Sequence, residues 1–209
     1  HIFGNSVERL EFDGYDVYGI SFSNEYSDES LINGFRVENP SKINILAVHS
    51  DLVSSGGKSR YSPVTPADIA STAVDYAALG HVHEFSGIKA ANSTHYAYCG
   101  TPEARGFDET GVKGVIIGNV YKNHTELKFV DVCKRQFVEV NLDVTDCLDY
   151  LEICDKITES CVGQDNLFKI NLYGEREENL FLDTSLIYER IKDNYFYVKV
   201  NDTTLPKIN

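Results

Sequence analysis

The chain has 209 residues, of which 42% are hydrophobic and 24% are charged, and its formal net charge is −13. A chain of this length buries roughly 70% of its unfolded surface, so it needs no disulfide staples. No apolar run reaches the about 18 residues of a membrane span. The negative net charge excludes a surface covered with basic residues, which non-specific nucleic-acid binding would require. It does not exclude an enzyme that holds phosphate at one local site.

Cysteine and methionine usage adds two expectations. The five cysteines are an odd number and contain no C-x-x-C pair, which predicts neither a disulfide framework nor a cysteine zinc site. With no visible secretory signal, we expect a reducing, cytoplasmic location. The absence of methionine indicates either a fragment of a longer protein or modified methionines that the printed sequence omits.

The amino-terminal segments alternate between apolar and polar residues, as strands do. We expect strands at residues 1–4, 7–12 and 17–22, with a turn at Asp13-Gly14. The polar triplet Ser27-Asp28-Glu29 then predicts a short helix that carries Leu31, Ile32 and Phe35.

A strand, a helix and a second strand follow. The apolar run at residues 43–48 predicts a buried strand, and residues 76–79 predict another. Between them, Thr65-Pro66-Ala67-Asp68 supplies a capping hydroxyl, a proline at the first helical position and a carboxylate at the third, so we expect a helix over residues 66–73. The order predicts a βαβ unit.

Three histidines follow these two strands. His49 ends the first strand, and His81 and His83 come after the second, beyond the turn residue Gly80. In an extended backbone, residues two apart point to the same side, so the rings of His81 and His83 can converge on one or two cations. An isolated His-x-His pair is more often a surface or core pair than a metal site. Because ligands gather at the carboxyl ends of strands in α/β sheets, histidines at two strand ends favour a shared metal centre.

The loop between the first strand and the helix carries two basic residues, Lys58 and Arg60. Its Gly57-Lys58-Ser59 triplet suggests a phosphate-binding loop, but that motif requires glycine at position 52, where this chain has Leu52. Two interpretations remain. Either the segment is a mobile surface loop, or it faces substrate and its two basic side chains meet phosphate.

The rest of the chain predicts two more groups of elements, with a boundary at Lys134-Arg135. Before it we expect strands at residues 94–99, 114–121 and 126–132, the last two joined by a turn at residues 122–124. After it we expect strand 137–142, a helix capped by Asp146 and ending near Gly163, strand 167–173, helix 184–192 and strand 195–200, which together form an α+β module. Cys147, Cys154 and Cys161 recur every seven residues, and we expect them to face the core on one helical face rather than to bind metal.

Three segments resemble the calcineurin-like metallophosphoesterases, within which the bacterial DNA-repair exonuclease branch of SbcD type is most similar. They are Ala-Val-His49-Ser, Gly80-His81-Val82-His83 and the segment Tyr98-Cys-Gly-Thr-Pro-Glu-Ala-Arg105-Gly-Phe-Asp-Glu109. The resemblance covers residues 1–133 as the later part of a catalytic domain and 136–209 as a capping domain. It implies an α/β fold, a metallophosphoesterase-type β-sandwich flanked by helices but incomplete here, followed by the small α+β cap.

The resemblance also implies a centre of two divalent metal ions, usually manganese, that activates water against a phosphodiester. By position, His49 and His81 look like ligands of one metal and His83 of the other. The family's earlier motifs, Asp-x-His, Gly-Asp-x-x-Asp and Gly-Asn-His-Asp or Glu, are absent from this chain, so its catalytic residues are unknown and it carries half a site. Three imidazoles alone would favour zinc, nickel or copper.

We therefore expect part of a metal-dependent phosphodiesterase, a DNA exonuclease subunit in DNA repair, whose fragment is inactive alone. We assign Lys58, Arg60 and Arg105 to substrate binding. The expected partners are DNA, an SbcC-type ATPase subunit and a second copy of the chain, with no membrane. Two alternatives stay open: a non-catalytic fragment that docks the ATPase, and a metallophosphatase for small substrates.

Overall fold

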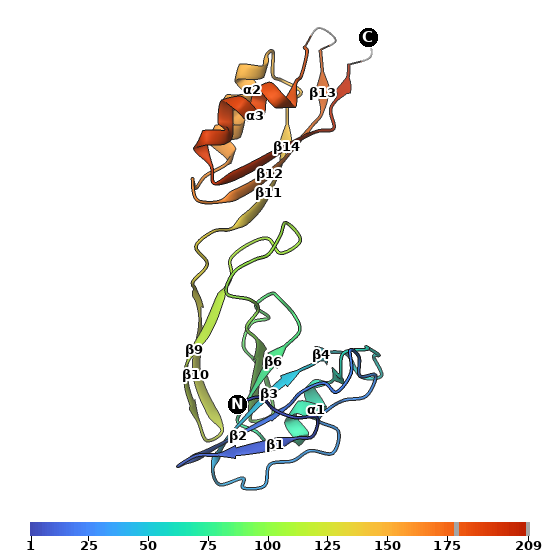
Figure 1. Cartoon of the computed structure of the whole chain (residues 1–209), viewed down its shortest axis with the longest axis vertical. Coiled ribbons are helices and arrows are strands. Elements are labelled where there is room, and N and C mark those ends of the chain that lie inside the picture. Colours follow the sequence, from blue (N-terminus) through green and yellow to red (C-terminus); the bar gives the residue numbers. More distant parts are fainter. Residues whose placement is uncertain (178–179, 208–209) are drawn as a thin grey trace. The chain divides into compact units, whose positions relative to one another are not determined.

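The computed structural model describes residues 1–177 and 180–207, which form two compact units along the chain (Figure 1). The first unit comprises residues 1–102 and 113–132, and the second comprises residues 103–112 and the chain from Cys133 onward. In the described residues, no helix is both long and apolar enough to cross a membrane.

A six-stranded sheet forms the first unit. Its order is β1 (Glu8–Glu11), β2 (Tyr15–Ile20), β3 (Ile43–His49), β6 (Tyr76–Gly80), β8 (Thr94–Tyr98) and β7 (Lys89–Ala91). The four central strands are parallel, whereas β1 and β7 pair antiparallel at the two edges. In β3 every second side chain is buried, which is the pattern of a strand with one core-facing side.

Helix α1 (Pro66–Ser71) connects β3 to β6, so the predicted βαβ unit is confirmed. The Thr65 hydroxyl accepts a hydrogen bond from the backbone of Asp68, and the Asp68 carboxylate accepts one from the backbone of Thr65. This capping box satisfies amide groups that a six-residue helix cannot pair internally. Ile69 then fixes the helix to the sheet, where it is fully buried. The short strands β4 (Asp51–Leu52) and β5 (Pro63–Val64) pair beside it.

A long hairpin of β9 (Gly114–Tyr121) and β10 (His124–Asp131) completes the first unit. The buried carboxylate of Asp75 anchors its turn, because it accepts hydrogen bonds from the Asn123 amide at 2.8 Å and from Lys122 Nζ at 3.1 Å. Phe85 also stacks on Phe129 of the hairpin, with ring centroids 4.4 Å apart. Among the described residues, this unit contains two strand pairs besides the six-stranded sheet: the hairpin and the β4–β5 pair. These two pairs do not form the complete second layer of a β-sandwich.

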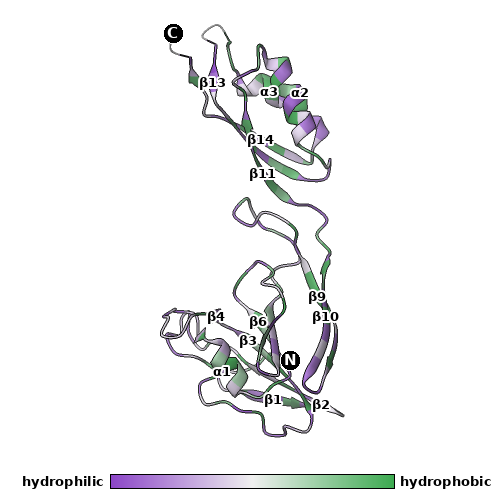
Figure 2. Cartoon of the chain, turned by 180° about the vertical axis from the view of Figure 1, so that it is seen from behind, coloured by the Kyte–Doolittle hydropathy of each residue, from purple (hydrophilic) through white to green (hydrophobic). Residues whose placement is uncertain are grey.

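The second unit contains three parallel strands: β11 (Phe137–Asp143), β12 (Leu167–Tyr173) and β14 (Tyr197–Asp202), in that order. Helices α2 (Tyr150–Ser160) and α3 (Thr184–Ile191) connect them and lie on one face of the sheet (Figures 1 and 2). A 3-10 turn at Lys192–Asn194 follows α3, and β13 (Glu175–Arg176) pairs with β15 (Leu205–Pro206). Because the strands are parallel and joined by helices, this unit is α/β rather than the expected α+β module.

The core of the second unit lies between the sheet and the two helices. Phe168, Ile170 and Leu172 of β12 are almost fully buried there. Cys147, Cys154 and Cys161 are buried as predicted, but they do not share one helix, because Cys147 precedes α2 and Cys161 is its C-cap. The predicted cap Asp146 is wrong. Asp149 caps α2 instead, since its side chain accepts hydrogen bonds from the backbone amides of Leu151 and Glu152, which have no partner within the helix.

Two predictions for the amino-terminal part are wrong. Residues 1–4 form no strand, because their one sheet-like hydrogen bond, from the Ser21 amide to the Gly4 carbonyl, is not extended into a ladder. The segment after Ser27 forms turns rather than a helix. The Leu31 amide bonds to the Ser62 hydroxyl, and Gly34 has a φ of 72°, so the backbone leaves the helical region.

Candidate metal centre

The parallel pairing of β3 with β6 brings two of the three histidines together. In this register His49 lies opposite Gly80, so His81 follows directly at the same edge of the sheet. Nδ1 of His81 is 3.3 Å from Nε2 of His49, and the two rings meet edge to face with centroids 5.2 Å apart. The sheet register therefore creates the pair.

The backbone at this sheet edge allows the rings of His49 and His81 to approach each other closely. His81 has a φ of 115°, a region in which a residue with a side chain costs about 1–3 kcal/mol unless its surroundings hold it. Gly80 leaves room for the neighbouring ring, because a Cβ atom there would lie 3.1 Å from Nδ1 of His49. Strained backbone of this kind concentrates at functional sites, which makes the His49–His81 pair the strongest candidate in the first unit.

Aromatic rings hold both imidazoles from the sides. Tyr61 stacks on His81 with ring centroids 4.6 Å apart and an interplanar angle of 31°. Phe22 packs edge-on against His49 at 5.7 Å. These contacts restrict the rotamers of both histidines, so the nitrogens stay aimed at one another.

The electrostatic surroundings favour neutral His49. Burial lowers the pKa of its imidazole below the ordinary value of 6.5, and the charges of His81 and His83 lower that pKa further. The His83 carbonyl accepts a hydrogen bond from Lys113 Nζ at 3.1 Å, which fixes the backbone after the pair. Neutral imidazole is the form that binds metal.

The geometry fits a metal only in part. Two imidazole nitrogens that bind one tetrahedral ion at about 2.0–2.1 Å lie about 3.3–3.4 Å apart, which matches the observed separation of His49 and His81. Among residues 1–177 and 180–207, however, no group of three or more His, Cys, Asp or Glu side chains is arranged to hold an ion. The pair can supply two ligands, but these residues do not complete a centre.

Two tyrosines support the site, and the sequence patterns did not indicate either of them. The Tyr98 hydroxyl donates to the Ser50 carbonyl and accepts from the Leu52 amide, each at 2.7 Å, and so fixes the backbone that follows His49. Burial raises the pKa of Tyr98 to about 12. Tyr61 reaches His81 because its carbonyl accepts from the Asp51 amide at 2.8 Å. These contacts join residues that are far apart in the chain, so no local sequence pattern predicts them.

The basic residues assigned to substrate lie in different places. Lys58 and Arg60 line a hollow of about 570 Å³ together with Asp28 and Ser59. The Arg60 guanidinium lies 3.6 Å from the ring centroid of Tyr26, which in turn is 5.6 Å from the ring of Tyr61. A chain of contacts therefore links Arg60 to the histidine pair. Arg105 belongs to the second unit, where its guanidinium contacts Glu109 at 3.3 Å.

Comparison with known proteins gives one informative similarity. No family model matches the chain. Over 152 residues, or 70% of the chain, it is 28% identical to YhaO of Bacillus subtilis strain 168, named as an uncharacterized metallophosphoesterase. This similarity supports the metallophosphoesterase superfamily. The chain spans about 37% of the length of this relative.

Proposed function

We propose that the chain is the carboxyl-terminal part of a metal-dependent phosphodiesterase that degrades DNA as an exonuclease. His49, His81 and His83 are its imidazole ligands for a centre of two divalent ions, manganese in our proposal. The observation that carries the proposal is the 3.3 Å separation of His49 Nε2 and His81 Nδ1 at the carboxyl ends of two parallel strands. The similarity to a metallophosphoesterase supports the reaction class.

Each part of the site has a role in this proposal. Divalent ions, when bound, polarise the phosphoester and lower the pKa of water. His49 stays neutral, as a ligand must, because burial and the nearby histidines disfavour its protonation. Tyr61 and Phe22 hold the two rings in place. Lys58 and Arg60 meet the phosphates of the substrate, since both line the hollow on the loop that leads to Tyr61.

The carboxylates that a two-metal centre needs come, in this proposal, from residues outside the present sequence. Two observations support this. The described residues contain no complete ligand group, and the relative is much longer than the chain. Two ions held about 4 Å apart act as a clamp on the attacking and leaving oxygens. Without the remaining ligands this clamp cannot form, so the chain by itself should be inactive.

The test uses the longer protein of which the chain is a part, purified beside the 209-residue chain. Release of nucleotides from linear duplex DNA and of nitrophenol from a nitrophenyl phosphodiester is measured with added manganese. His81→Ala should abolish both reactions in the longer protein. His124→Ala is the matched control, because His124 is an exposed histidine at the start of β10 and its replacement should leave activity unchanged.

Each alternative has its own outcome. Hydrolysis of the small ester without digestion of DNA would identify a small-substrate phosphatase. Inactivity of the longer protein towards both substrates would favour a non-catalytic role, such as docking an ATPase. Digestion of DNA by the 209-residue chain, abolished by His83→Ala, would show that all ligands lie within it and would overturn the half-site.

A further inference from the structure

Strand β14 leaves one edge of the second sheet open. On its inner side β14 pairs with β12 from Tyr197 to Asp202. Among the described residues, no backbone group bonds to its outer side. The opposite edge is different, because the Gly111 amide donates to the Phe137 carbonyl of β11 at 3.4 Å. The Phe107 ring packs against both Phe137 of β11 and Tyr197 of β14, with centroid distances of 5.0 Å and 6.3 Å. An uncovered edge is a template for a further strand.

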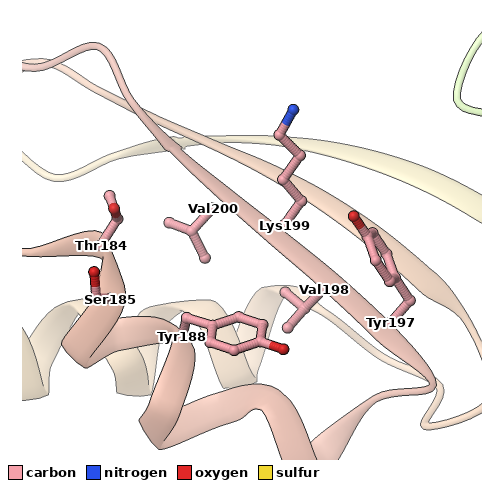
Figure 3. Close-up of a pocket in the computed structure, with 7 residues that line it drawn as sticks. All are labelled: Thr184, Ser185, Tyr188, Tyr197, Val198, Lys199 and Val200. Atoms are coloured by element: carbon pink, nitrogen blue, oxygen red, sulfur yellow. The ribbon is translucent and has the colours of Figure 1, made fainter.

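A groove lies along this open edge. It has a volume of about 330 Å³ and runs between α3 and β14 (Figure 3). Thr184, Ser185 and Tyr188 of α3 form one wall, and Val198 and Val200 form the apolar side of the strand. Lys199 and Tyr197 stand on the other side of β14, as alternation along a strand requires (Figure 3). Apolar side chains of an added strand would enter the groove at every second position.

The open face of the sheet shows which charge an added strand should carry. Glu139, Lys169 and Lys199 form one row across the three strands. Glu139 and Lys169 form an ion pair at 2.9 Å, whereas Lys199 has no ion-pair partner among the described residues. Because opposite charges directly across two strands are stabilising, a glutamate opposite Lys199 would continue the pattern.

The next row across the three strands consists of Asn141, Asn171 and Asn201, whose hydrogen bonds all run in the same direction. Asn201 donates its side-chain amide to Asn171 at 2.8 Å, and Asn171 donates to Asn141 at 2.9 Å. The side-chain oxygen of Asn201 is therefore the free acceptor at the open edge of the described row. A side-chain amide on an added strand, two residues after the glutamate, would donate to it.

We propose that β14 and α3 bind an extended segment of a partner protein as a fourth, parallel strand with the pattern Val-Glu-Val-Asn. The glutamate pairs with Lys199, the asparagine donates to Asn201, and the valines enter the groove beside Tyr188. Residues 138–141 of β11 have this same pattern: Glu139 forms an ion pair with Lys169 of β12, and Asn141 accepts a hydrogen bond from the side-chain amide of Asn171. Main-chain bonds supply affinity in such strand addition, and the alternate side chains supply specificity.

The probe is a fluorescent peptide, Gln-Phe-Val-Glu-Val-Asn-Leu-Asp, added to the 209-residue chain. Binding is followed by anisotropy, and amide hydrogen exchange locates it. The peptide should slow exchange at residues 197–202. Lys199→Glu should weaken binding at least about threefold, and a peptide with lysine in place of glutamate should recover it. Lys134→Glu makes the same charge change at an exposed position outside β14 and should have no effect.

Three results would overturn the proposal. One is binding without slower exchange in β14. Another is equal affinity of the glutamate and lysine peptides for the unaltered chain, a comparison that does not depend on the variant folding. The third is sedimentation of the chain as a dimer that the peptide dissociates, which would make a second copy the occupant in place of a foreign segment.

Discussion

Nδ1 of His81 lies 3.3 Å from Nε2 of His49, although 32 positions separate the two residues in the chain. The parallel register of β3 and β6 places both at one sheet edge, and the positive φ of His81 turns its ring towards His49. The arrangement leads to a direct expectation for the protonation of His49.

In an NMR pH titration of the metal-free chain, the pKa of His49 should lie below 6.5, because burial and the charges of His81 and His83 lower it. A depressed pKa means that the folded state resists protonation. The stability linked to His49 is therefore complete above about pH 6.5 and is lost as the pH falls through the lower folded value. His81→Ala should raise this pKa only in part, since burial is the larger cause. A His49 pKa above 6.5 would contradict the arrangement.

Tyr98→Phe should destabilise the chain by about 1–3 kcal/mol, because it leaves the Ser50 carbonyl and the Leu52 amide without their partner. The pH dependence has a defined sign. The pKa of Tyr98 is raised to about 12, so its contribution is complete below about pH 10 and is lost as the pH rises towards 12. Urea unfolding at pH 8 and pH 11 measures both effects. An unchanged unfolding free energy at pH 8 would show that the two hydrogen bonds are not made.

Asp75→Ala should cost at least about 1–3 kcal/mol, because the buried carboxylate accepts from the amides of Asn44 and Asn123, which would lose their partner. The hairpin turn should also exchange its amide hydrogens faster. Lys122→Ala is the matched control. It removes one partly exposed end of the ion pair and leaves both amides bonded, so its effect should be smaller. Equal losses for the two variants would assign the anchor to the ion pair instead.

The parts of the fold that local sequence signals predict are those with strong periodicity or caps. The capping box at Thr65 and the apolar runs that end at His49 and Leu79 predicted α1, β3 and β6 to within two residues. The helix expected after Ser27 failed because Ser62, far along the chain, bonds to the Leu31 amide and competes with helical bonds.

The candidate site also contains residues that local sequence signals predict and residues that they do not. Histidines at two strand ends predicted that His49, His81 and His83 share one centre, and the parallel strands bring His49 and His81 together at one sheet edge. Tyr61 and Tyr98 could not be predicted, because their contacts with His81 and with the backbone after His49 arise from tertiary pairing alone. The metal roles of His49, His81 and His83 and the substrate roles of Lys58, Arg60 and Arg105 stay predictions.

Limited proteolysis tests the division expected at Lys134-Arg135. Trypsin should cut after Lys134, whose side chain is exposed, before it cuts after Arg135, whose guanidinium lies 3.7 Å from the ring centroid of Phe196. Phe196→Ala should remove this difference. First cleavage within α2 would show instead that the helical part of the second unit opens before the segment at Lys134-Arg135 is cut.

Manganese ions test the metal assignment most directly, because the paramagnetic ion broadens the NMR signals of nearby nuclei even when binding is weak. Substoichiometric Mn²⁺ should broaden the ring signals of His49, His81 and His83 at pH 7.5, while the exposed ring of His124 stays sharp. The selective broadening should disappear at pH 5, where imidazole ligands bind protons instead. Broadening that is uniform over the acidic surface, or that reaches His124 first, would contradict a metal centre at the ends of β3 and β6.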